Sequence, residues 1–201
     1  MLDRAATALI KPAVNRLASL FVRAGLSANQ MTLIGFFIGM IATIFIATQA
    51  HMAGAATILL SRLCDALDGA MARQTQPTDA GGFLDIALDF LFYAAIPLAF
   101  AIAQPPTNAL AAAVLLAAFI GTGSSFLAFA VMATKRGLTS LDYPNKSFYF
   151  LGGLTEATET LVCFVAMCVW PQHFSTIAYV FAALCAATIV MRICWGWHQF
   201  S

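Results

Sequence analysis

Long apolar stretches are the feature that most limits how this chain can fold. Of its 201 residues, 61% are hydrophobic and only 9% are charged, which lies far outside the range of a soluble globular domain. An α-helix needs about 20 apolar residues to cross the ~30 Å hydrocarbon layer of a bilayer. We predict membrane-spanning helices near residues 31–50, 53–72, 82–103, 108–132, 148–170 and 175–195.

Residues 1–24 precede the first predicted span and have a different pattern. Their apolar side chains can share one helical face, which basic residues border. Charges spread through the stretch are not typical of a cleaved signal peptide. We therefore predict an amphipathic helix on the membrane surface, followed by a six-helix bundle over residues 31–195. No repeat or linker divides the chain, so residues 1–201 are expected to form one all-α membrane domain.

The basic residues predict the orientation of the bundle. All ten lysine and arginine residues lie outside the short connections near residues 49–51, 104–107 and 171–174. Because basic residues are enriched on the cytoplasmic side, we expect both termini and the loop 133–147 to be cytoplasmic. This distribution favours contact with anionic membrane lipid and argues against a nucleic-acid partner.

Four aspartates interrupt the second and third predicted spans. Asp65 and Asp68 are spaced i, i+3, and Asp85 and Asp89 are spaced i, i+4, so each pair projects from one face of its helix. A carboxylate at membrane depth costs at least ~2.5 kcal/mol, and no cluster of basic residues lies nearby to compensate it. Carboxylates that face one another in this way suit hard divalent cations such as Mg²⁺ or Mn²⁺.

The residues around these aspartates complete a longer pattern. Gly69 and Ala72 keep the helix thin, and Arg73 follows one turn below Gly69, where its planar guanidinium could take a phosphate. The order Asp-x₂-Asp-Gly-x₂-Ala-Arg, then seven residues, then Gly-x₃-Asp-x₃-Asp resembles the signature of the CDP-alcohol phosphotransferase family at every fixed position. The similarity includes residues 25–35, and residues 146–160 are similar to a segment of some bacterial inner-membrane members.

The resemblance implies an enzyme that transfers a phosphatidyl group from CDP-diacylglycerol to a small alcohol, with release of CMP, in phospholipid biosynthesis. It implies two divalent cations, Mg²⁺ or Mn²⁺, whose ligands are Asp65, Asp68, Asp85 and Asp89. Asp89 is also implied to be the general base. The residues implied to bind the CDP part of the donor are Asn29, Thr32, Gly69, Ala72, Arg73 and Thr78. A homodimer in the bacterial inner membrane is the implied assembly.

The acceptor pocket is the least defined part of this prediction. Glu156 and Glu159 share a face of the fifth span, well inside its cytoplasmic end. They contact either the hydroxyl or amino groups of the acceptor or a nearby arginine, Arg62 or Arg192. A second candidate set lies in the loop before this span: Lys135, Arg136 and Lys146. These residues either bind an acceptor phosphate or reflect only the cytoplasmic bias of basic residues.

Three other interpretations remain open at this point. Asn29 and Thr32 could cap the first span instead of binding nucleotide. The four aspartates could serve a metal-ion or proton-coupled transporter, although Arg73 and the glycine positions have no evident task in transport. An inactive homodimeric scaffold is disfavoured because every signature position is present. The acceptor alcohol, and the choice between CDP-diacylglycerol and another CDP-linked donor, are left open by the sequence.

Overall fold

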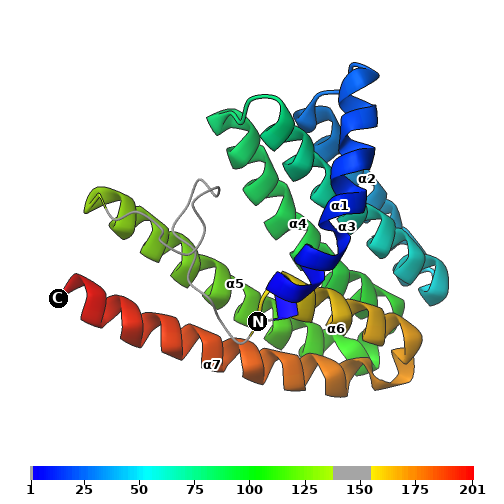
Figure 1. Cartoon of the computed structure of the whole chain (residues 1–201). Coiled ribbons are helices and arrows are strands. Elements are labelled where there is room, and N and C mark those ends of the chain that lie inside the picture. Colours follow the sequence, from blue (N-terminus) through cyan, green and yellow to red (C-terminus); the bar gives the residue numbers. More distant parts are fainter. Residues whose placement is uncertain (1, 138–154) are drawn as a thin grey trace.

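The computed structural model describes residues 2–137 and 155–201. These residues form helices and no strands, which confirms the predicted all-α class (Figure 1). The helices are α1 (Leu2–Arg23), α2 (Ala28–Ala47), α3 (His51–Gln74), α4 (Asp79–Ala103), α5 (Pro105–Lys135), α6 (Ala157–Val169) and α7 (Phe174–Phe200), with a 3₁₀ turn at Pro171–His173.

Four of the described helical segments are long and apolar enough to cross a membrane: α2, α4, α5 and the stretch Pro171–Phe200 that contains α7. The second predicted span coincides with α3, but the charged residues of α3 lower its hydropathy. Helix α6 has 13 residues, about 20 Å, which is shorter than the hydrocarbon layer. This helix lies within the fifth predicted span, 148–170. Residues 148–154 of that span, and Lys146, lie outside the described residues. Six spans and a surface helix therefore stay predictions.

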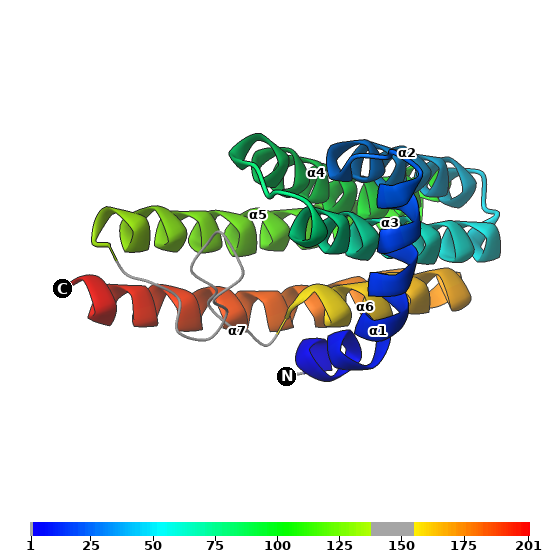
Figure 2. The same ribbon diagram turned by 45° about the horizontal axis from the view of Figure 1, so that its top comes forward.

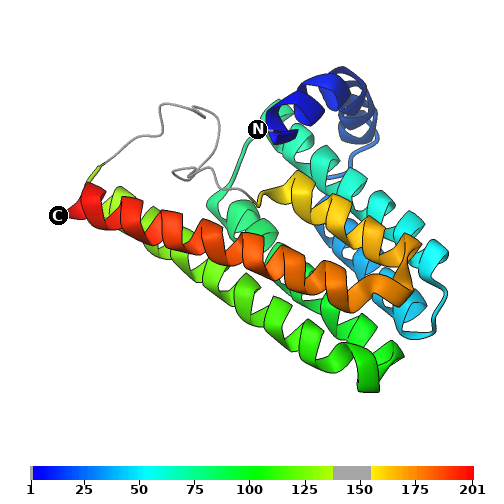
Figure 3. The same cartoon turned by 90° about the horizontal axis from the view of Figure 1, so that it is seen from below.

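The bundle has two packing centres, α2 on one side and α7 on the other. Helix α2 packs against both α3 and α4, α5 packs against α4 and α7, and α6 packs against α3 and α7. Figure 2 shows α1 running across the direction of the other helices, where it contacts α3 and α6. Figure 3 shows α6 and α7 side by side, on the side of the bundle opposite α2.

Two glycines one turn apart allow α2 to approach α3 and α4 closely. A Cβ atom on Gly35 would lie 2.9 Å from the Cβ of Cys64 in α3. A Cβ atom on Gly39 would lie 2.6 Å from a ring carbon of Phe92 in α4. Small residues are common where membrane helices meet, because they bring the two backbones together. Helix α2 therefore holds the two aspartate-bearing helices in a fixed relation to each other.

Helix α1 is attached to the last turn of α3. Ala18 is completely buried in the cluster that joins these two helices. The side-chain amide of Gln74 donates to the carbonyl of Asn15 at 3.0 Å, and its oxygen accepts from the hydroxyl of Ser19 at 2.9 Å. These bonds hold the end of α3, where Arg73 is found.

Candidate functional site

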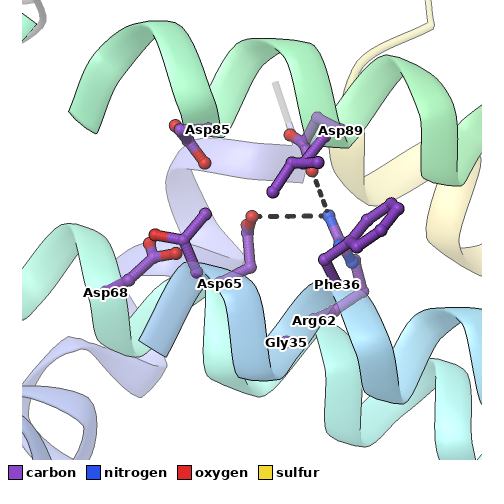
Figure 4. A pocket seen from close by; sticks show the side chains of 9 residues that line it. Gly35, Phe36, Arg62, Asp65, Asp68, Asp85 and Asp89 are labelled. Atoms are coloured by element: carbon purple, nitrogen blue, oxygen red, sulfur yellow. Dashed lines mark hydrogen bonds and ion pairs between the residues drawn. The ribbon is translucent and has the colours of Figure 1, made fainter. Parts of the chain in front are cut away.

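Three carboxylates from two helices, one of them buried and two half-buried, meet at one place. One carboxylate oxygen from each of Asp65, Asp68 and Asp85 lies within 4.8 Å of the other two. Figure 4 shows Asp65 and Asp68 projecting from α3 towards Asp85 and Asp89 on α4. The helical spacing of each pair thus brings the acids to one place, as the sequence predicts. Together these four acids line a cavity of about 10 Å³, which is room for one water-sized ligand.

Asp68 is the most buried member of this cluster. Only 5% of its surface is exposed, and its Oδ2 atom is buried with no hydrogen-bond partner among the described residues. A buried carboxylate oxygen without a partner is costly unless a cation or a donor satisfies it. An all-oxygen set of three carboxylates is the donor set that Mg²⁺ and Mn²⁺ prefer. The residues present therefore fit a divalent cation.

Asp89 has a different environment from the other three acids. Its Oδ1 atom accepts a hydrogen bond from Nη1 of Arg62 at 2.6 Å, and the same nitrogen lies 3.5 Å from Oδ1 of Asp65. The structure thus pairs Arg62 with these aspartates. It supplies a positive charge among the acids, where the sequence showed no basic cluster.

Arg73 folds back over Gly69, as the signature spacing suggests. A Cβ atom on Gly69 would lie 3.3 Å from Nη1 of Arg73, so the glycine leaves room for the guanidinium against the helix. Arg73 is exposed, and its neighbour Ala72 is half-buried on the same turn. The arrangement presents a planar cation that a phosphate could reach.

The remaining predicted nucleotide residues lie at the starts of α2 and α4. Ser27 is the N-cap of α2 and forms a capping box with Gln30, so neither Asn29 nor Thr32 is the cap. The side-chain oxygen of Asn29 lies 2.7 Å from the position of a Cβ on Gly81 in α4. The Thr32 side chain lines the carboxylate cavity and donates to the carbonyl of Ala28.

Thr78 has a structural task of its own. It is the N-cap of α4, and its hydroxyl oxygen accepts from the backbone N–H of Gly81 at 3.1 Å. An N-cap of this kind contributes about 1 kcal/mol to helix stability. The same hydroxyl lies beside Asn29, because both approach Gly81.

A second, larger cavity adjoins the aspartates. Its volume is about 260 Å³, and both Asp89 and Arg192 line it. The other lining residues include three threonines and three phenylalanines: Thr122, Thr155, Thr160, Phe90, Phe119 and Phe126. Arg192 donates from Nη1 to the carbonyl of Thr122 at 2.9 Å, while its buried Nε has no partner among the described residues. Its charged lining residues are thus two acids, Asp89 and Glu156, and one arginine, Arg192.

Of the described residues predicted to bind the acceptor, Glu156 lines the second cavity, whereas Glu159, Lys135 and Arg136 do not. Glu156 lines the second cavity, but it is the N-cap of α6 and not an interior residue of a longer helix. Its backbone N–H donates to Oε2 of Glu159 at 3.1 Å, which completes a capping box. Carboxylates are favoured at helix N-termini, where backbone N–H groups are free. This explains why the helix begins at the two glutamates, which the sequence places inside a longer span.

Two of the three basic candidates, Lys135 and Arg136, lie near the end of α5. Lys135 is exposed in the last turn of that helix. Arg136 donates to the carbonyls of Gln199 and Phe200, so it joins the end of α5 to the end of α7. Neither residue is among the described residues that line the two cavities.

Arg62 and Arg192 are the site residues that sequence reasoning missed. From the sequence, both arginines are predicted only as possible partners for Glu156 and Glu159. The available signal was the presence of an arginine within an otherwise apolar span, which usually marks a functional position. The spacing of Arg62 three residues before Asp65 gives a contact within α3, but the bond to Asp89 requires the packing of α4.

Known proteins of similar sequence indicate the family of this chain. A model of the family described as CDP-alcohol phosphatidyltransferase matches residues 26–195. Inner membrane protein YnjF of Escherichia coli is 50% identical over 197 residues, which cover 98% of this chain and 96% of YnjF. Archaetidylinositol phosphate synthase of Methanothermobacter thermautotrophicus is 27% identical over 188 residues, covering 88% of this chain and 86% of that protein.

Solved structures show the same fold. Phosphatidylinositol phosphate synthase PgsA1 of Mycobacterium tuberculosis with CDP-DAG bound has a TM-score of 0.73 and 22% identity, and the match covers 92% of this chain and 93% of that one. The complex of the same enzyme with manganese and citrate has a TM-score of 0.72 and 22% identity, over 92% and 88% of the two chains. The family match over residues 26–195 and the 50% identity to YnjF show that the chain belongs to the CDP-alcohol phosphatidyltransferase family.

Proposed function

We propose that this protein transfers a phosphatidyl group from CDP-diacylglycerol to the hydroxyl of a small alcohol and releases CMP. One observation carries the proposal. The carboxylates of Asp65, Asp68 and Asp85 meet within 4.8 Å, beside an Asp89 that also lines a cavity large enough for a small alcohol. Family membership supports the reaction class, and the PgsA1 structure with CDP-DAG bound supports the choice of donor.

Divalent cations are assigned to the carboxylate cluster. Asp65, Asp68 and Asp85 supply the oxygen ligands, and the PgsA1 complex with manganese supports this use of the fold. We propose two ions, Mg²⁺ or Mn²⁺, with Asp89 contributing to the second. When bound, such ions withdraw charge from the diphosphate and stabilise the departing phosphate.

The nucleotide part of the donor is assigned to the starts of α2 and α4 and to the end of α3. Exposed Arg73, folded over Gly69, is positioned to pair with a phosphate. Asn29 and Thr78 meet at Gly81, so α2 and α4 offer polar groups side by side. The full set proposed to bind CDP is Asn29, Thr32, Gly69, Ala72, Arg73 and Thr78.

The acceptor is assigned to the cavity between Asp89 and Arg192. Its hydroxyl oxygen forms a bond to the phosphorus attached to the lipid, and the bond from that phosphorus to the oxygen of CMP breaks. The hydroxyl proton moves to the carboxylate of Asp89, which acts as general base. Arg192 and the threonine hydroxyls can bind an anionic group of the acceptor, and Glu156 can accept from its hydroxyl groups, a combination that suits a polyol phosphate. Relatives named for inositol phosphate lipids support testing that class first.

The membrane setting of the reaction is also a proposal. We propose a multi-pass protein of the bacterial inner membrane with both termini cytoplasmic, supported by the likeness to the E. coli inner membrane protein and by the apolar helices. In this orientation the acyl chains of the donor stay in lipid while its nucleotide enters from the cytoplasm. A homodimer is proposed from the family resemblance.

The test is CMP release by the purified protein from CDP-diacylglycerol, with Mg²⁺ or Mn²⁺ and a set of acceptors: glycerol phosphate, inositol, inositol phosphate, serine and choline. We expect release with at least one acceptor, and a new lipid by mass spectrometry. Asp89→Asn should lower the rate of release by about 100-fold or more. Replacing Asp79, an exposed aspartate on the same helix, by Asn should not change the rate. No release with any acceptor, or full release by Asp89→Asn, would contradict the proposal.

The transporter hypothesis has a separate readout. Cation flux into proteoliposomes without nucleotide would favour it, and family membership argues against it. Replacing CDP-diacylglycerol by another CDP-linked alcohol in the same assay tests the choice of donor.

A further inference from the structure

Arg62 lies between the two helices that carry the aspartates. Its Nη1 atom is 2.6 Å from Oδ1 of Asp89 on α4 and 3.5 Å from Oδ1 of Asp65 on α3. One nitrogen of the guanidinium therefore contacts an acid from each helix (Figure 4). The shorter contact is a charge-assisted hydrogen bond, which is stronger and more directional than a neutral one.

The surroundings leave Arg62 little freedom to move. Only 13% of its side chain is exposed, and its guanidinium carbon lies 4.1 Å from the centre of the Phe92 ring. Its Nη2 atom donates to the hydroxyl of Ser61 at 3.4 Å, and Ser61 donates to the carbonyl of Gly35 at 2.8 Å. The cation–π contact and these bonds fix the plane of the guanidinium before any substrate binds.

Asp89 lines both the small carboxylate cavity and the larger cavity next to it. With Oδ1 bonded to Arg62, its carboxylate has a defined position at the boundary between the two. We propose that Arg62 is a positioning residue, which holds Asp89 at this boundary for proton transfer and lowers the affinity of the adjacent site for divalent cations. The inference rests on the proposed function, because Asp89 needs a fixed orientation only if it serves as the base.

The effect on cations follows from charge. Arg62 offsets one of the four negative charges at the site, and its Nη1 is 3.5 Å from an Asp65 oxygen that would bind the cation. A positive charge at that distance opposes the binding of a divalent cation to the same oxygen. Removing the charge should therefore raise the affinity of the site for the cation, while Asp89 loses its orientation. A residue with a packing role alone would behave differently, since its loss would loosen α3 and α4 and weaken cation binding.

The experiment compares the full-length Arg62→Met variant with the wild-type protein in two measurements. Binding of Mn²⁺ alone is followed by electron paramagnetic resonance of the free ion, and CMP release is followed with CDP-diacylglycerol and the accepted alcohol. We expect kcat to fall by about 10-fold or more, with the KM for the donor changed by less than about 3-fold, as for a residue that acts in the transition state. The Kd for Mn²⁺ should be lower than that of the wild-type protein.

Two further variants separate positioning from folding. Arg62→Lys keeps the charge but cannot reproduce the planar fork, so it should recover part of kcat and bind Mn²⁺ within about 2-fold of wild type. If Arg62→Met does not fold, Arg62→Lys replaces it in the measurement of kcat. Arg16→Met, which removes an exposed arginine from α1, is the matched control and should change neither measurement.

A double-mutant cycle identifies the group through which Arg62 acts. If Arg62 works through Asp89, then Arg62→Met should change the residual turnover of Asp89→Asn by less than about 2-fold. The inference is overturned by an unchanged or weaker Mn²⁺ affinity in Arg62→Met, by turnover within about 2-fold of wild type, or by additive losses in the cycle. If the wild-type protein releases no CMP at all, the proposed function fails, and the Mn²⁺ comparison still tests the electrostatic effect of Arg62.

Discussion

Gly39 of α2 and Phe92 of α4 are in direct contact, so that a Cβ on Gly39 would lie 2.6 Å from a ring carbon of Phe92. A side chain at this position must displace the ring or separate the helices. We predict that Gly39→Val lowers the free energy of unfolding by ~1–3 kcal/mol, as overpacking of a close contact usually does. Thermal unfolding in detergent measures this change.

Gly82 provides the matched control for that substitution. A Cβ on Gly82 of α4 would meet nothing within 4 Å. Gly82→Ala should therefore leave stability unchanged or raise it by about 0.5–1 kcal/mol, because alanine is the better helix former. Equal stability of the Gly39→Val variant and the wild-type protein would show that α2 can move away from α4 at little cost.

Asp68 should have opposite effects on stability with and without metal. In a chelator, Asp68→Asn should raise the free energy of unfolding by about 1 kcal/mol, because it removes a buried charge whose Oδ2 has no partner among the described residues. In Mn²⁺ the wild-type protein should be stabilised by binding, and the variant much less. Thermal unfolding in both buffers checks the prediction, and equal stabilisation of the two proteins by Mn²⁺ would contradict it. Exposed Asp79→Asn serves as the control.

Gly69 should control donor affinity through Arg73. A Cβ at Gly69 would lie 3.3 Å from the guanidinium, so Gly69→Ala must shift Arg73 by a few tenths of an ångström. We expect the KM for CDP-diacylglycerol to rise by about 3–10-fold with a smaller change in kcat, the pattern of lost ground-state binding. Steady-state CMP release measures both constants, and an unchanged KM would argue against a phosphate contact by Arg73.

Thr78 can be tested for two roles at once. Thr78→Ala removes the N-cap of α4 and should cost about 1 kcal/mol of stability, whereas Thr78→Ser keeps the capping oxygen and should not. Unfolding experiments measure the cap, and the donor KM measures binding. A Thr78→Ala variant with wild-type stability would show that the cap is dispensable.

Arg192 should determine acceptor affinity. If it faces an anionic group of the acceptor, Arg192→Met should lower kcat/KM for that acceptor by about 10-fold or more and leave the donor KM unchanged. Acceptor titrations of CMP release give both values, with Arg16→Met as the control. Loss of donor affinity to the same degree would instead indicate a general disturbance of α7.

The helices that carry the aspartates were accessible to sequence reasoning. Apolar periodicity predicts spans near 53–72 and 82–103, and the structure has α3 and α4 at His51–Gln74 and Asp79–Ala103. Helical spacing then suffices to bring the acids to one place, because the link between the two helices is short. The start of α6 was not accessible in this way. The apolar residues upstream of Glu156 predict a span that begins near residue 148. Helix α6 begins instead after Glu156, where a capping box satisfies the first backbone N–H groups.

The partner of Arg62 could not be predicted for a related reason. Sequence spacing reports on contacts within one helix, and the bond from Arg62 to Asp89 crosses to another helix, 27 positions away. That contact depends on how closely α2 draws α3 and α4 together, which is decided by Gly35 and Gly39. The same holds for Arg192, whose cavity is bounded by residues of α4, α5, α6 and α7.

The packing of α2 against both α3 and α4 affects the distance between the acids of the candidate metal site, and this distance bears on which ion would fit. The separation of the opposing acids depends on a helix that contributes no acidic ligand of its own. In an all-oxygen site, ionic radius is what distinguishes Mg²⁺ from the larger Ca²⁺. With a divalent cation bound, a preference between these two metals would therefore depend partly on two glycines of α2, Gly35 and Gly39, that supply no carboxylate.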